Sequence, residues 1–207
     1  MPATATHAFF AKDVYDILPG DIKKQLSISR SKMFAQSTDS LMFYNLLSIL
    51  PGKNIRYFQK YFHRNQTQEF FLNLLRYIKD SNIKDKDTLS FLFGFITHYA
   101  LDSIIHPYIF YKTGCFNKNK PNTYKYNNIH TFMETFIDND MIRRRLKTNP
   151  YEFQFTKFCF NTEPFSNELN KTINYTFFNT FKLKDMDKIY YKSLKQAKNC
   201  FKTFRID

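Results

Sequence analysis

The chain has 207 residues, a net charge of +13, and a composition that is 43% hydrophobic and 19% aromatic. This composition excludes a disordered chain, and the length suits one domain with a single core. Only 4 glycines occur, which argues against the many tight turns of a β fold and favours helices.

The positive charge has two interpretations. It favours a phosphate-bearing partner, such as nucleic acid, anionic lipid or a phosphorylated substrate. The chain is also crowded with Lys, Asn, Ile, Phe and Tyr, a bias that an AT-rich genome produces without selection for any partner. The charge alone therefore does not identify a partner.

Helical spacing of apolar residues predicts an amphipathic helix over 6–18 and a second helix over 21–35. A short apolar helix is predicted over 40–50, where Pro51-Gly52 would end it. Residues 65–79 repeat apolar positions at helical spacing and predict a further helix.

The next predicted helix contains the stretch GFITHYALDSIIHPYI, residues 94–109, and Asp87-Thr88 is expected to cap its start. Pro107 lacks a backbone N–H, so this helix is expected to end or kink near His106.

A polar loop over 112–126 separates that helix from another over 129–146, and residues 184–203 are expected to form a closing helix. No segment alternates as a strand, so the sequence predicts an all-α domain that spans residues 1–207.

The cysteines and the first residues of the chain help to predict the cellular compartment. Cys115, Cys159 and Cys200 lie far apart without a CxxC pair, so neither a disulfide framework nor a thiolate zinc site is indicated. Free thiols suit a reducing compartment. The first residues lack a basic start followed by an apolar run, and no apolar run approaches ~20 residues. We therefore expect a cytoplasmic protein without a transmembrane segment.

One stripe of metal-ligating residues is predicted on the helix that contains residues 94–109. His98, Asp102 and His106 stand at i, i+4 and i+8, which drift by only ~40° per step around a helix axis. His130 and Glu134 form a second i, i+4 pair. Imidazole and carboxylate are zinc ligands, and a metal would offset the cost of burying the Asp102 charge among apolar neighbours. The two pairs predict a His/carboxylate metal site.

Three further residues have a structural alternative. His7 and His63 are single histidines, which in most proteins are hydrogen-bonded core residues. Asp39, with Ser37 and Thr38 before it, is typical of a helix N-cap region. Spacing alone leaves their roles open.

Five segments together resemble the zinc-dependent phospholipase C family: THAFFAKDVYDIL, FAQSTDSLMFY, YFHRNQTQEFF, FGFITHYALDSIIHPY and IHTFMETFIDND. The resemblance is to the short, signal-less bacterial branch and runs in order over about residues 6–140. The HxxxDxxxHP element is its specific motif, and the wider superfamily includes single-strand nucleases with three zinc ions. The resemblance implies an all-α helical bundle around a zinc cluster.

The family also implies which residues bind each ion. The first ion would be held by four residues: Asp39, His63, His98 and Asp102. Asp102 would bridge to a second ion, which His7 also binds. The third ion would be held by His106, His130 and Glu134. All five histidines of the chain then have a role. Asp39 and Asp102 are the candidate catalytic residues, with Asp39 both ligand and proton acceptor for a zinc-activated water.

The chain departs from the family in one respect. Secreted members begin with a tryptophan whose amino group and carbonyl complete the second zinc site. This chain has no Trp, and six residues precede His7. The departure predicts a second ion that is weakly held or absent, unless Pro2, exposed by removal of Met1, replaces the missing ligand.

Three functional hypotheses follow from the sequence. The first is a phospholipase C-like hydrolase that cuts a lipid phosphodiester and is compatible with peripheral membrane contact. The second is a nuclease or small phosphodiesterase on the same metal site, with nucleic acid the less favoured partner. The third is a metal-stabilised helical protein without turnover.

Overall fold

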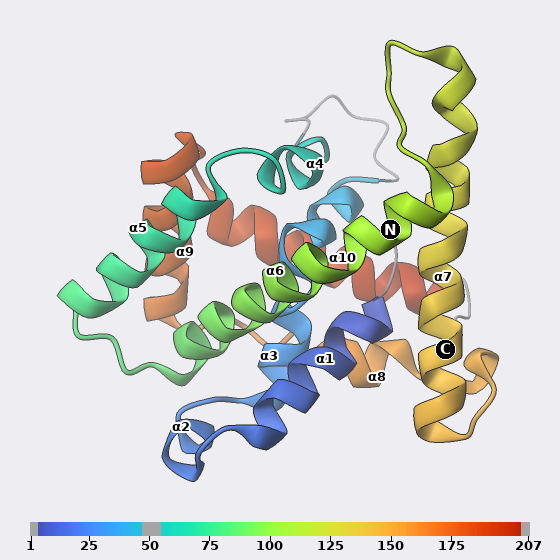
Figure 1. Cartoon of the computed structure of the whole chain (residues 1–207). Helices are drawn as coiled ribbons and strands as arrows, with labels where there is room; N and C mark the ends of the chain where they lie inside the picture. The colour runs from blue at the N-terminus through green and yellow to red at the C-terminus, as the bar shows by residue number, and fades with distance from the viewer. Residues whose placement is uncertain (1–3, 47–54, 204–207) are drawn as a thin grey trace.

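The computed structural model describes residues 4–46 and 55–203, and these residues are helical or in connecting turns (Figure 1). No strand occurs in either described range. The predicted all-α fold is therefore confirmed.

The longest helix, α6 (Lys86–Thr113), runs through the middle of the molecule (Figure 1). Its N-cap is Asp85, whose carboxylate accepts a hydrogen bond from the Thr88 amide at 2.9 Å. The predicted cap at Asp87 is therefore wrong. Asp87 instead accepts a hydrogen bond from Arg30 Nε at 2.9 Å and so binds α6 to α3 (Ile28–Phe34).

Helix α6 also passes through Pro107 and continues to Thr113, so a helix end near His106 is wrong, and the alternative, a kink there, stays a prediction. Proline removes the hydrogen bond to the carbonyl four residues earlier, which here belongs to Ser103. Ser103 is an exposed residue, so the helix loses this hydrogen bond at a solvent-facing position and not in the core.

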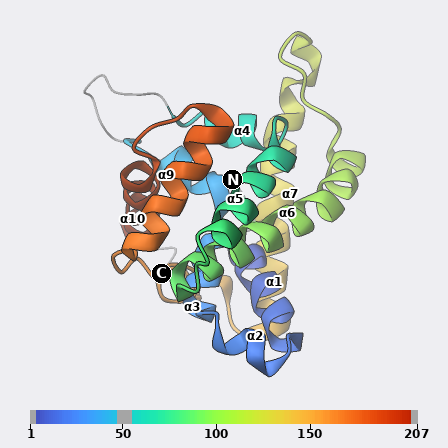
Figure 2. The same ribbon diagram turned by 90° about the vertical axis from the view of Figure 1, so that its left-hand side faces the viewer.

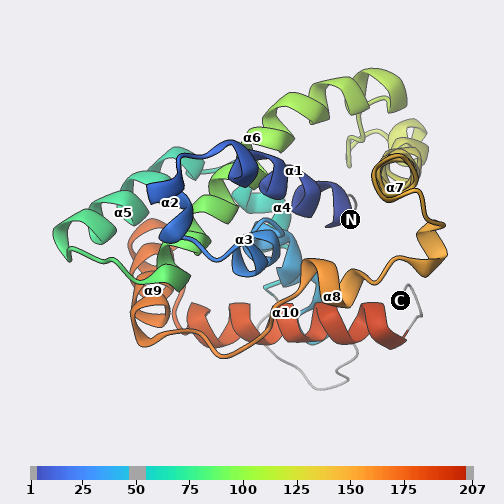
Figure 3. The ribbon, with the colours of Figure 1, turned by 90° about the horizontal axis from the view of Figure 1, so that it is seen from below.

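The other helices surround α6 in a layered arrangement. Helix α1 (Thr4–Ile17) and α3 pack against α6, while α5 (Thr67–Asp80) and α9 (Asn167–Phe181) form a pair at one end (Figure 2). Seen from below, α3 and α8 (Phe155–Cys159) lie between α6 and α10 (Met186–Thr203) (Figure 3). Helix α7 (Tyr124–Leu146) contacts α6 and α1 at the other end.

Three sequence predictions differ from the observed elements. The predicted helix over 21–35 is two helices, α2 (Gly20–Lys24) and α3, because the Ser27 amide donates a hydrogen bond to Ser90 Oγ at 2.8 Å instead of continuing the helix. The described part of 40–50 belongs to a 3-10 helix, η1 (Ser37–Phe43), and to the turn after it, while residues 47–50 lie outside the described residues. Helix α7 begins inside the predicted loop over 112–126.

The tail contains two α-helices that the sequence pattern did not predict, α8 and α9, and one that it did, α10. The remaining short elements are α4 (Phe58–Phe62), η2 (Pro121–Thr123) and η3 (Pro150–Glu152).

Aromatic rings fill the core along the first half of α6. The ring centroids of Phe91 and Phe95 lie 4.3 Å apart, and Phe62 meets Phe70 edge to face at 5.0 Å. Edge-to-face pairs gain energy beyond their buried area. Phe62 and Phe70 also meet Phe95 of α6 at 6.1 and 5.4 Å, so ring packing joins α6 to α4 and α5. The half of α6 that carries His98, Asp102 and His106 extends from this core.

Gly94 allows α3 to approach α6 closely. A Cβ atom at Gly94 would lie 2.6 Å from Phe34 Cβ and 2.7 Å from the Phe34 carbonyl carbon, which no side chain tolerates. The close approach places the backbone of Ala35 one helical turn along α6, beside His98.

The described part of the chain contains one helix, α6, with the length and apolar composition that crossing a membrane requires. Core helices of soluble proteins meet the same test, and 44% of the most apolar window of α6 is buried in this structure. By length and composition alone, α6 is therefore an exception to the predicted absence of a sufficiently apolar segment.

Candidate metal centre

The structure brings all eight predicted ligands to one cleft of about 1390 Å³ between α1, η1, α6 and α7. Seven of them line the cleft, and His98 lies directly behind it with an exposed fraction of 1%. The eight residues come from five separate segments, because His63 directly follows α4. Folding alone therefore assembles this set.

His98 has one ring nitrogen fixed and the other free. Its Nδ1 donates a hydrogen bond to the Ala35 carbonyl at 2.8 Å. Its Nε2 is buried and makes no hydrogen bond, although it lies 3.3 Å from Asp102 Oδ2. A backbone carbonyl that holds one nitrogen of a histidine leaves the other nitrogen oriented as a metal ligand. The arrangement fits a metal-binding histidine better than a hydrogen-bonded core histidine.

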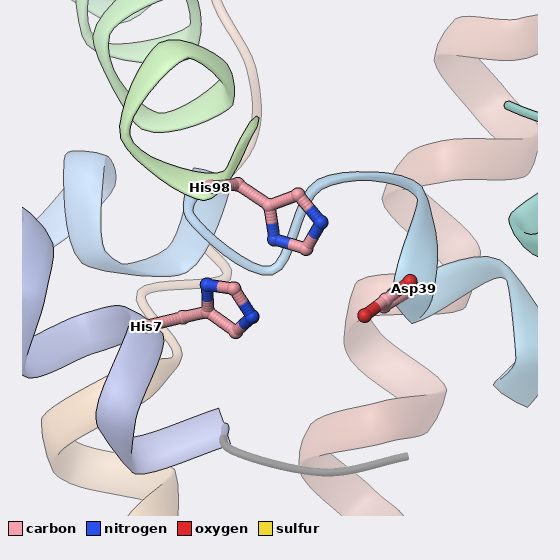
Figure 4. A group of neighbouring side chains, drawn as sticks. All are labelled: His7, Asp39 and His98. Atoms are coloured by element: carbon pink, nitrogen blue, oxygen red, sulfur yellow. The ribbon is translucent and has the colours of Figure 1, made fainter. Parts of the chain in front are cut away.

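His7 lies on α1 beside His98, and their ring centroids stack 4.2 Å apart. Figure 4 shows the two imidazoles one above the other, with the carboxylate of Asp39 facing them from η1. Ligand atoms of these three residues lie within 4.8 Å of one another.

Asp102 is the centre of the cluster. Its Oδ1 lies 3.3 Å from His7 Nε2 and 3.7 Å from His106 Nδ1. Its Oδ2 lies 3.3 Å from His98 Nε2 and 3.6 Å from His63 Nδ1. Two ligands of one tetrahedral zinc ion, each bound at 2.0–2.1 Å, stand about 3.4 Å apart. The spacing around both oxygens of Asp102 fits ligands that share metal ions.

Asp39 and His63 form the side of the cleft opposite α1. Asp39 Oδ1 and His63 Nε2 are hydrogen-bonded at 3.0 Å. The Asp39 carboxylate is therefore engaged with His63. No side-chain cap hydrogen bond occurs at the start of η1, so the N-cap interpretation of Asp39 is not supported.

Glu134 organises a second, outer group. Its Oε1 lies 2.8 Å from His130 Nε2 and 3.3 Å from His106 Nε2, and the two imidazole rings stack 5.5 Å apart. The buried Nδ1 of His130 has no hydrogen-bond partner. Because His106 also approaches Asp102, this group is continuous with the first.

The carboxylates and imidazoles shift one another's pKa. Burial raises the pKa of Asp102, but His98 and His7 outweigh burial and hold that pKa well below its ordinary value. Burial lowers the pKa of His98, but Asp102 and Asp39 outweigh it and raise that pKa to about 9.

The outer group behaves in the same way. Burial raises the pKa of Glu134, but hydrogen bonds with His106 and His130 lower it overall. Burial lowers the pKa of His106, and Glu134 and Asp102 raise it overall. Without metal, His98 and His106 hold their protons more strongly than free imidazole, and a bound cation must displace those protons.

Sequence reasoning missed one residue of this region, Asp138. Its buried carboxylate accepts hydrogen bonds from the Ala5 amide at 3.0 Å, the Thr6 amide at 2.8 Å and Thr6 Oγ1 at 2.6 Å. These bonds satisfy free N–H groups at the start of α1 and hold His7 next to the cluster. The signal was present, because Asp138 follows Glu134 by one helical turn.

The fold and the site define a class: an all-α protein with overlapping His/carboxylate groups that are able to hold metal ions in one cleft. The family model described as zinc-dependent phospholipase C matches residues 6–195, and the chain belongs to this family. The match extends past residue 140 into the tail, further than the five sequence segments indicated. No curated protein and no solved structure matches the chain. The family supports a metal-dependent, phospholipase C-like function, and its name implies zinc.

Pro2, the candidate replacement for the missing tryptophan ligand, lies outside the described residues. Its position relative to His7 therefore stays a prediction.

Proposed function

We propose that the protein is a zinc-dependent phosphoester hydrolase of the phospholipase C type, which acts with two or three ions and cuts a phosphodiester. The observation that carries the proposal is the position of Asp102, whose two oxygens each face two imidazole nitrogens at 3.3–3.7 Å. A carboxylate shared in this way is suited to bridging two cations.

The ligands divide into three sets. His63, His98, Asp39 and Asp102 would hold the first ion, and Asp102 with His7 the second. His106, His130 and Glu134 would hold the third. Bound zinc lowers the pKa of a coordinated water toward ~7, which supplies hydroxide at neutral pH.

The chain itself supplies a proton acceptor and basic side chains at the cleft. Burial raises the pKa of Asp39, but the hydrogen bond with His63 and the charge of His98 outweigh it, and the pKa is lowered. Asp39 is therefore a carboxylate at neutral pH and is able to accept a proton from the attacking water. Lys60 and Arg64 line the same cleft, and their charges attract the phosphodiester.

The test combines metal analysis with a substrate panel. We expect at least two zinc equivalents per chain and hydrolysis of a phospholipid or a soluble phosphodiester. Asp39→Asn should remove most turnover, while Asp16→Asn, an exposed carboxylate paired with Lys12, serves as the matched control. Zinc binding without hydrolysis of lipid, soluble diester or single-stranded DNA would leave the metal-stabilised scaffold as the function. Hydrolysis of DNA alone would identify a nuclease.

A further inference from the structure

The 31 residues between Asp102 and Glu134, which we call the acid-free corner (residues 103–133), contain no Asp or Glu. They carry four lysines, Lys112, Lys118, Lys120 and Lys125, and all four are exposed. The corner comprises the end of α6, the connecting loop with η2, and the start of α7. It is therefore a purely positive region within the chain.

The corner is also apolar on its surface. Only Ile109 and Thr113 are buried within it. Eight of the 22 exposed large hydrophobic side chains of the described residues lie here: Ile104, Tyr108, Phe110, Tyr111, Phe116, Tyr124, Ile129 and Phe132. Figure 1 shows the loop and the first turns of α7 projecting beyond the other helices at the upper right. These eight side chains are therefore exposed on a part of the molecule that projects from the helical body.

The tip of the corner is internally bonded. Tyr124 Oη donates to the Lys118 carbonyl at 2.8 Å, and the Asn117 amide donates to Thr123 Oγ1 at 2.9 Å. The rings of Phe116 and Tyr124 lie 5.5 Å apart. These contacts connect the loop backbone to the start of α7 at the tip of the corner.

The corner is continuous with the metal centre. Phe110, Phe116 and Lys118 line the same cleft as His106 and His130. The Phe110 ring lies 5.1 Å from the His130 ring. A surface that binds the corner would therefore lie at the mouth of the cleft.

We infer that the acid-free corner docks the protein on an anionic lipid surface and so brings lipid phosphodiesters to the cleft. Aromatic rings and lysines are the side chains that settle at a membrane interface, where lysine charges meet anionic head groups. The claim that the cleft hydrolyses lipids rests on the proposed function, whereas the claim that the corner binds a lipid surface does not.

Two other occupants fit less well. A second copy of the chain would bring the same four lysines together without a carboxylate to pair them, which is repulsive. A single-stranded nucleic acid needs a charged groove with rings along it. In this chain Ile104, Tyr108 and Tyr111 are exposed, and their helical spacing places them on the face of α6 opposite His106. Exposed apolar side chains therefore also lie outside the cleft, where they would not line a groove for a nucleic acid.

The experiment measures partition of the full, zinc-loaded chain onto phosphatidylcholine vesicles with and without phosphatidylglycerol. We expect preferential binding to the phosphatidylglycerol vesicles. Lys120→Glu with Lys125→Glu should weaken that binding by at least tenfold, since each lysine near an anionic surface is worth about fivefold. The matched control is Lys24→Glu with Lys84→Glu, which makes the same charge change at exposed lysines outside the corner.

A second pair of variants tests the rings. Tyr111→Ser with Phe132→Ser should weaken vesicle binding by about tenfold. Tyr151→Ser is the control, because Tyr151 is 81% exposed, as Tyr111 is at 82%, and lies outside the corner. Equal binding to both vesicle types, or equal losses in the corner and control variants, overturns the inference. So does a result in which the corner variants abolish binding to a single-stranded oligonucleotide or dimerisation and leave vesicle binding intact.

Hydrolysis of a soluble phosphodiester separates this inference from the proposed function. Tyr111, Phe132, Lys120 and Lys125 do not line the cleft, so their variants should hydrolyse the soluble substrate at the wild-type rate. Corner-dependent vesicle binding without any hydrolysis would sustain the docking and reject the hydrolase. If the protein hydrolyses the soluble substrate and the corner variants bind vesicles as the wild type does, only the docking is rejected.

Discussion

The metal centre has two parts that the fold holds in different ways. The inner group consists of Asp39, His63 and three buried residues, His7, His98 and Asp102, whose exposed fractions are 4%, 1% and 8%. The outer group consists of His106, His130 and Glu134, in which the two imidazole side chains are 29% and 20% exposed.

The difference follows from the supporting helices. The inner group sits where α1, α3 and α6 pack together, and a backbone carbonyl orients His98. The outer group depends only on α6 and α7, next to the exposed acid-free corner. Ions in the inner group should therefore be coupled to folding, and the outer ion should exchange more readily with solvent.

The largest expected effect comes from Asp102→Asn. This change keeps the side-chain shape but removes the charge that allows two cations to lie close together. We expect nearly all turnover to be lost, together with more than one zinc equivalent, as measured by steady-state kinetics and elemental analysis. Glu134→Gln should lower turnover and remove only the outer ion. If Glu134→Gln also empties the inner group, the two parts are not separable.

The second largest effect should come from removal of the metal, which should lower the free energy of unfolding. The candidate ligands come from five segments, so bound ions would cross-link helices that are distant in sequence. A ligand at about 1,000 times its Kd stabilises the folded state by about 4 kcal/mol. For a chain of this size that corresponds to a melting temperature lower by on the order of 10 °C after chelation. Calorimetry with and without EDTA measures it, and an unchanged transition in verified metal-free protein would reject structural coupling.

Gly94→Ala tests how the core positions the inner group. The added Cβ would lie 2.6 Å from Phe34 Cβ and 2.8 Å from the Ala35 amide nitrogen, so α3 must move. Overpacking of this kind costs about 1–3 kcal/mol. Gly20→Ala is the control, because nothing lies within 4 Å of its Cβ. Denaturant unfolding should show a lower free energy of unfolding for Gly94→Ala and no change for Gly20→Ala. The zinc affinity of the inner group should also fall in Gly94→Ala. An equal fall in the zinc affinity of the outer group would contradict the proposed difference between the two groups.

The smallest effect concerns pH in the metal-free protein. The pKa of His98 rises from 6.5 to about 9 on folding, so protonated His98 stabilises the metal-free fold. That stabilisation is fully present below 6.5 and is lost as the pH rises through about 9. As a zinc ligand His98 would be neutral, so this loss should be absent from the zinc-loaded protein. The measurement is the melting temperature of the metal-free and the zinc-loaded protein at several pH values between neutral and alkaline. An equal change of both melting temperatures with pH would count against the prediction.

The sequence by itself determined the features that depend on local periodicity. The all-α fold follows from helical spacing and few glycines. The stripe of His98, Asp102 and His106 and the pair of His130 and Glu134 were visible because one helix turn brings i and i+4 together. The single residues His7, Asp39 and His63 have no such local pattern, and only the family resemblance connected them with the stripe.

Tertiary structure decided the rest. Pro107 does not end α6, because the carbonyl it leaves unpaired belongs to a residue that faces solvent. Asp138 holds the start of α1 across 132 residues of sequence, a contact that no local pattern encodes. Which nitrogen of His98 is free depends on the Ala35 carbonyl, which reaches it because Gly94 allows α3 and α6 to approach closely. The sequence supplied the ligand types, and long-range packing set their orientation.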